Sequence, residues 1–198
     1  MVAQLTDSTI NPVVNAWTQD PNQAQFTNAG NNPYYGPIAG WDTSQVTDMY
    51  KLFSEQSSFN GDISQWNVSA VTTMELMFLG ATAFNGDISQ WNVSKVINMW
   101  GMFLRSTAFN GDISQWNVSA VTTMESMFWG ASAFNIDIRG WSVSASTVRT
   151  EMFTGATLMI QNYSAPPTPT PATQWFIIDQ VHKVDYLEVM VRFLNLPQ

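Results

Sequence analysis

Five tryptophans lie at one fixed spacing of 25 residues: Trp41, Trp66, Trp91, Trp116 and Trp141. Two phenylalanine series keep the same interval, one from residue 53 to residue 153 and the other from residue 59 to residue 134. A strict period between about 20 and 50 residues indicates a repeat architecture, in which each unit buries its apolar side chains only by stacking on its neighbours. The Trp, Phe and Met series are therefore expected to form the core.

One unit, residues 59–83, predicts the local structure of all of them. Ile63, Trp66 and Val68 follow the apolar-x-x-apolar-x-apolar pattern of the strand in a leucine-rich repeat. The apolar residues of 71–78 then recur at three and four positions, which indicates a short helix or 3₁₀ turn that faces inward. Each unit is expected to be a short strand, a helical turn and a tight corner.

The ends of the chain differ from the repeats and predict four regions. Residues 1–40 are expected to be an N-terminal cap helix and loop, with Asp7 or Ser8 capping a helix whose apolar face is Ile10, Val13, Val14 and Trp17. Residues 41–163 hold the repeats, and residues 164–173 are a Pro/Thr-rich linker. Residues 174–198 form an apolar tail that favours a helix, although alternation over residues 187–193 also suits a strand. The tail residues expected to dock on a partner or on the last repeat are Trp175, Ile177, Val181, Val184, Leu187, Val191 and Leu194.

Charge and composition exclude several classes of function. The chain has 15 acidic and 7 basic residues, a net charge of −8, and no cluster of Lys or Arg, so neither a nucleic acid nor an anionic membrane surface is an expected partner. It has no cysteine and no run of 18 apolar residues, so no disulfide and no membrane span are expected. The N-terminus lacks the basic and apolar regions of an intact secretory signal.

The motif FN-x-DIS-x-W-x-VS-x-V, with M and MF following, begins at residues 59, 84 and 109, and YYGPIAGWDTSQVTDM precedes it. Over roughly residues 8–160 the chain resembles the BspA-like leucine-rich repeat surface proteins. The resemblance implies an α/β repeat fold, a right-handed solenoid of leucine-rich-repeat type, here with five coils of 25 residues and an N-terminal helical cap. It also implies a cell-surface or extracellular role in adhesion or protein binding, and it carries no catalytic residues.

The outward positions of the expected strands are uncharged and hydrogen-bonding, and they predict a binding face for a protein or a glycan. These residues are Ser64, Gln65, Asn67, Ser89, Gln90, Asn92, Ser114, Gln115 and Asn117. The leading hypothesis is a non-enzymatic interaction or adhesion module with no cofactor. The alternative is a structural or linker subunit of a larger assembly, intracellular or organellar, that is anchored by the C-terminal tail.

Two further series of residues have the chemistry of possible metal-binding or glycosylation sites. Asp62, Asp87, Asp112 and Asp137 are expected to accept backbone N–H bonds within their own turns. Weak Ca²⁺ sites shared with Asn60, Asn85 and Asn110 are the sharper alternative, but one carboxylate per unit is few ligands for a hard cation, and no metal site is assigned. Asn67, Asn92, Asn117 and Asn162 begin N-x-S glycosylation sequons, but an exposed polar column explains the first three without modification and is the favoured interpretation.

Overall fold

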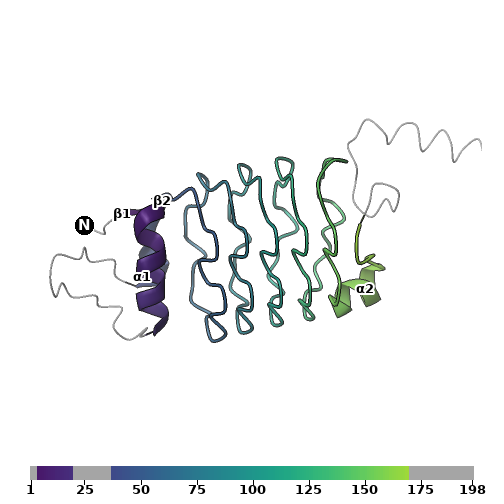
Figure 1. The fold of residues 1–198 in the computed structure, drawn as a ribbon, viewed down its shortest axis with the longest axis horizontal. Coiled ribbons are helices and arrows are strands. Elements are labelled where there is room, and N and C mark those ends of the chain that lie inside the picture. The colour runs from purple at the N-terminus through teal and green to yellow at the C-terminus, as the bar shows by residue number, and fades with distance from the viewer. Residues whose placement is uncertain (1–3, 20–36, 170–198) are drawn as a thin grey trace, which may run out of the picture.

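The computed structural model describes residues 4–19 and 37–169. In chain order the elements are β1 (Gln4–Thr6), α1 (Asp7–Gln19), the 3₁₀ helix η2 (Ile38–Gly40), β2 (Asp42–Gln45) and α2 (Thr157–Tyr163). The two α-helices lie at opposite ends, and a row of irregular turns from the 25-residue repeats lies between them (Figure 1). The predicted N-terminal helix is confirmed by α1, which buries Ile10 and Val14.

The predicted fold class, a right-handed α/β solenoid of leucine-rich-repeat type with five coils of strand and helix, is wrong. Within the described residues, the only sheet has two strands, β1 and β2, and neither helix belongs to a recurring strand-and-helix unit. Residues 63–68, expected to be a strand, form a turn in which the Trp66 N–H donates to the Ile63 carbonyl at 3.1 Å. The repeats contact one another through isolated parallel bridges instead, such as Thr73 with Asn98.

The segment of residues 74–80 shows why neither a helix nor a regular strand forms. Met74, Leu76, Phe78 and Gly80 donate their N–H groups to carbonyls 24 residues later, at 2.8–2.9 Å. Between them, the Met77 N–H donates three residues back to the Met74 carbonyl at 3.2 Å. Leu76 and Gly80 have φ angles of 55° and 65°, in the left-handed region. Two such residues in each repeat interrupt both helical and strand geometry, so the segment becomes a ladder of turns, here called the ladder segment.

The aromatic series form the core, which confirms the interpretation of the Trp column. The five tryptophans are 1–4% exposed. The indole N–H of Trp91 donates to the Ile63 carbonyl of the preceding repeat at 3.1 Å, and Trp66, Trp116 and Trp141 make the equivalent bond. The rings of Phe78 and Phe103 stack at 5.4 Å between centroids. Each repeat therefore buries its side chains against its neighbours and satisfies their polar atoms.

The N-terminal end of the stack is closed by β1 and α1. Strand β1 pairs in parallel with β2, and the side chain of Leu5 is fully buried. The Asp7 carboxylate accepts three hydrogen bonds, from the Thr47 N–H at 2.7 Å, the Thr47 hydroxyl at 2.6 Å and the Asp48 N–H at 3.0 Å. This side chain gives the first ladder residues the partners that a preceding repeat would otherwise provide.

The C-terminal end is closed by residues 164–169, the described part of the expected linker. The Phe153 N–H donates to the Pro167 carbonyl at 3.0 Å, and the Glu151 N–H donates to the Thr168 hydroxyl at 2.8 Å. Later residues of this segment bond to earlier residues of the last repeat, so the segment runs antiparallel to the last ladder segment. Arg149 stands where earlier repeats have Met and is 5% exposed; its Nε donates to the Pro169 carbonyl at 3.0 Å.

Some predictions fall on residues that the structure does not describe. The tail residues expected to dock lie outside the described part of the chain, as do residues 170–173 of the linker. In the last repeat, Ser146 stands where the earlier repeats have Val and is exposed, and Thr147 takes the buried place beside it.

Candidate interaction surface

The nine polar residues predicted to bind a partner lie on a row of turns and not on a strand, which corrects the expected local structure. In each of three successive repeats the Gln and the Asn are exposed and the Ser is half-buried. We call this surface the polar row, and it consists of Ser64, Gln65, Asn67, Ser89, Gln90, Asn92, Ser114, Gln115 and Asn117. The structure brings these residues together at one position of successive stacked repeats.

Short side-chain contacts orient the polar row. The amide nitrogen of Gln65 donates to the Ser64 hydroxyl at 3.2 Å, and the equivalent bonds in the next two repeats are 3.3 and 3.2 Å. The Asn67 side-chain oxygen accepts the backbone N–H of Ser69 at 3.1 Å and its hydroxyl at 2.7 Å. Each Asn thus closes its own turn, so the three repeats present the same groups in the same orientation.

The aspartate column also serves its own turns. Each carboxylate accepts the N–H of the residue two positions later, at 2.9–3.1 Å, in the column Asp62, Asp87, Asp112 and Asp137. The backbone N–H and then the hydroxyl of Ser64 hold the pKa of Asp62 below its usual value, and the following serines do the same for Asp87 and Asp112. This is the turn-closing role that the sequence favoured.

No group of three or more His, Cys, Asp or Glu residues that could hold a metal ion occurs within residues 4–19 and 37–169. The side-chain oxygens of Asn60 and Asn85, considered as Ca²⁺ ligands from the sequence, accept backbone N–H groups of the following repeat. They form an asparagine ladder in which Asn85, Asn110 and Asn135 each donate a backbone N–H to the preceding Asn, at 2.8–2.9 Å. Sequence reasoning missed this structural role of the asparagines, although their recurrence every 25 residues could have indicated it.

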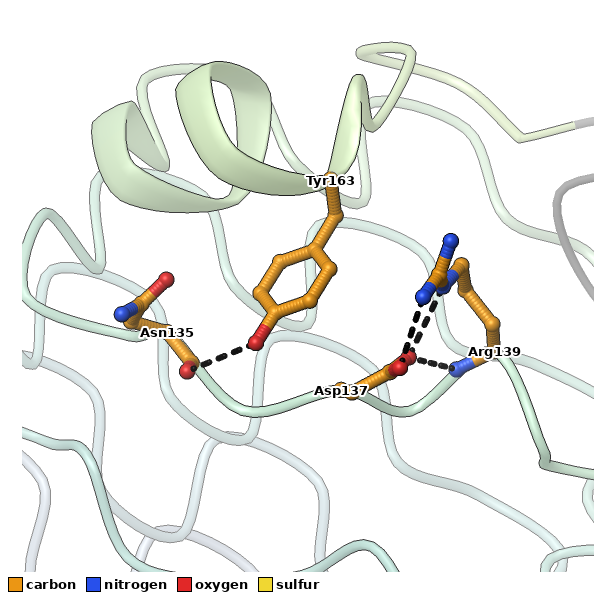
Figure 2. Close-up of polar contacts among 4 residues, drawn as sticks. All are labelled: Asn135, Asp137, Arg139 and Tyr163. Atoms are coloured by element: carbon orange, nitrogen blue, oxygen red, sulfur yellow. Dashed lines mark hydrogen bonds and ion pairs between the residues drawn. The ribbon is translucent and has the colours of Figure 1, made fainter.

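Helix α2 closes the asparagine ladder and the aspartate column together (Figure 2). The Asn162 side-chain nitrogen donates to the Asn135 side-chain oxygen at 2.8 Å, and the Tyr163 hydroxyl donates to the Asn135 carbonyl at 3.4 Å. Arg139 forms an ion pair with Asp137 at 2.8 Å, and its guanidinium lies 5.4 Å from the Tyr163 ring centroid. The hydrogen bonds from the Arg139 side chain lower the pKa of Asp137. The positive charge of Arg139 thus offsets the negative charge of Asp137, the last carboxylate of the column.

Of the four N-x-S sequons, three coincide with the polar row and the fourth lies in α2. Asn67, Asn92 and Asn117 are exposed, and so is Asn162. The outer side of the ladder segments carries a second group of side chains that sequence reasoning did not single out. Trp100 and Trp129 are half-buried there, and the Arg105 guanidinium lies 5.2 Å from the Trp129 ring centroid.

Comparison with protein families gives one match. Residues 22–112 and residues 69–166 match the family described as Mycoplasma protein of unknown function, DUF285. Together the two overlapping matches span residues 22–166, well over half of the chain. The chain belongs to this family. The family description assigns no activity.

No curated protein and no solved structure shows significant similarity to the chain. Within the described ranges, neither helix has the length and apolar character needed to cross a membrane.

Proposed function

We propose that the protein is a non-enzymatic interaction module that binds a protein or a glycan through the polar row. The observation that supports this is the threefold recurrence of the same exposed Gln and Asn, each held in the same geometry by contacts within its turn. Side chains that are already oriented lose little further freedom on binding, so weak polar contacts can contribute to affinity. A row of this kind suits a partner whose own hydrogen-bonding groups recur.

The stacking distance sets the scale of that recurrence. Equivalent phenylalanine rings in neighbouring repeats are 5.4–5.9 Å apart, so equivalent polar-row groups recur at a comparable interval along the stack. Several identical contacts act together on an extended partner, and their combined avidity exceeds that of any single contact. Adhesion at the cell surface, which the resemblance to BspA-like surface proteins implies, is part of this proposal.

The test is a triple substitution, Gln65→Lys, Gln90→Lys and Gln115→Lys, probed on a glycan array and with a displayed library of 12-residue peptides. A matched control places three lysines at Ser57, Ser132 and Gln161, which are exposed outside the polar row. We expect the wild-type chain and the control to retain ligands that the triple variant loses, with unchanged thermal melting. Equal binding by all three proteins would overturn the proposal.

A further inference from the structure

Three of the repeats differ from one another only in their later positions. Repeats 2 (residues 59–83), 3 (84–108) and 4 (109–133) are identical over their first eleven positions. All differences fall in the later positions, which include the ladder segment. Repeat 3 carries Lys95, Ile97, Trp100 and Arg105, where repeats 2 and 4 both carry Ala, Thr, Glu and Gly. Since repeats 2 and 4 adopt the same ladder without these side chains, stacking does not require them.

These four residues of repeat 3 lie at the outer side of the stack. Ile97 is 50% exposed, Lys95 and Arg105 are exposed, and Trp100 is half-buried. A contiguous exposed apolar surface is typical of contact sites. Trp and Arg are also the residue types that most often dominate binding energy at protein interfaces.

Arg105 contacts the neighbouring repeat through both its backbone and its side chain. Its backbone N–H donates to the Trp129 carbonyl at 2.7 Å, and its side chain passes over Gly130, where a Cβ atom would lie 3.7 Å from the Arg105 Cγ. The guanidinium then lies 5.2 Å from the Trp129 ring centroid. Trp129 replaces a Leu at this position of the repeat, so the cation and the ring that supports it both depart from repeat 2.

The charges around this group alternate along the stack. Neither Lys95 nor Arg105 forms an ion pair within the described residues, although the whole chain carries a net charge of −8. Glu75 and Glu125 occupy the position of Trp100 in the repeats on either side. Repeat 3 thus adds two cations that form no ion pair within the described residues, and the repeats on either side each carry one carboxylate at the position of Trp100. A carboxylate with basic groups around it would complement this charge pattern. A polyanion would be repelled by the flanking glutamates.

We propose that Lys95, Ile97, Trp100, Arg105 and Trp129, the repeat-3 patch, form a docking surface for a protein partner. The partner presents an Asp or Glu side chain toward Arg105, and apolar side chains toward Trp100 and Ile97. This surface is separate from the polar row, which lies within the first eleven positions of each repeat, so either proposal can fail without the other.

The experiment selects 12-residue peptides from a displayed library on the immobilised full-length chain. Selected sequences are then synthesised and measured by fluorescence anisotropy. We expect peptides with an acidic residue beside apolar ones, whose affinity falls by about tenfold or more on Arg105→Gly or Trp100→Glu. Both substitutions restore the residue that repeats 2 and 4 carry, so folding is preserved and lost binding reports on the patch.

Charge exchange gives the sharper readout. A peptide whose acidic residue is changed to Lys should bind poorly to the wild type and regain affinity for Arg105→Glu. The control Lys51→Glu, at an exposed cation that precedes repeat 2, should leave the affinities of both peptides as they are for the wild type. Failure to enrich any peptide above the Arg105→Gly background would overturn the proposal. So would peptides that are indifferent to both repeat-3 variants but lost with the three polar-row lysines, because the contact would then lie on the polar row.

Discussion

Replacing the central tryptophan, Trp91→Ala, tests whether the indole column holds the stack together. The side chain is 4% exposed. A buried Trp removes roughly 150–250 Å² from water, and at about 25 cal/mol per Å² this corresponds to about 4–6 kcal/mol. The remaining Ala methyl keeps a small part of this burial free energy, and partial collapse of the cavity recovers some more of it. We expect a loss of about 3–5 kcal/mol in the free energy of unfolding, measured by urea denaturation with circular dichroism.

The companion variant Trp91→Phe separates volume from hydrogen bonding. It removes the indole N–H that donates to the Ile63 carbonyl, but that carbonyl still accepts the Trp66 N–H at 3.1 Å. The hydrogen-bond part of its cost should therefore stay near the lower end of about 0.5–1.5 kcal/mol, and the whole cost well below that of Trp91→Ala. Equal losses for both variants, or a loss under about 1 kcal/mol for Trp91→Ala, would refute the reasoning from cavity volume.

Three other predictions follow from the backbone and the two ends. Gly80→Ala should lower the melting temperature, because φ is +65° and a left-handed conformation costs an L-residue about 1–2 kcal/mol; the exposed Glu55 side chain, 2.6 Å from the new Cβ, only has to move aside. Ser126→Gly, at φ +53°, should raise the melting temperature by relieving about 1 kcal/mol of left-handed strain. A higher melting temperature for Gly80→Ala than for Ser126→Gly would contradict this account of the two positions. Burial opposes ionisation of Asp7, but the hydrogen bonds from Thr47 and Asp48 outweigh it and lower the pKa of Asp7. The stabilisation by this carboxylate is therefore fully present above the pKa of the unfolded chain and is lost as the pH falls through the pKa of the folded protein. Melting of wild type and Asp7→Ala should therefore converge as pH falls from 7 to 2, and a constant difference would disprove the linkage. Truncation after Tyr163 should melt earlier than truncation after Pro169, which keeps the segment bonded to the last ladder; identical curves would show that this segment does not cap the stack.

Properties that depend on spacing alone were predictable. The 25-residue period identified the buried Trp and Phe columns, and the apolar pattern of residues 10–17 identified α1. The turn-closing role of the aspartate column followed from the side-chain chemistry of Asp within an Asn-Gly-Asp turn, as in the bond from the Ser64 N–H to Asp62. These inferences hold because the periodicity of burial is determined by the exact repeat, and local hydrogen bonding is determined by a few neighbouring residues.

The sign of φ and the choice of hydrogen-bond partner were decided by the tertiary structure. Apolar residues spaced three and four apart indicate a face that points inward. A ladder of turns produces the same inward face as a helix, so the spacing does not distinguish the two. Leu76 adopts a left-handed φ, and its N–H donates to the Trp100 carbonyl in the next repeat. No residue within reach of a helical turn specifies that bond. Pro167 looks like part of a linker by composition, yet its carbonyl accepts the Phe153 N–H, because the last ladder segment has no further repeat to bond. Backbone groups must find partners wherever the folded chain provides them, and that requirement is met only once the repeats are stacked.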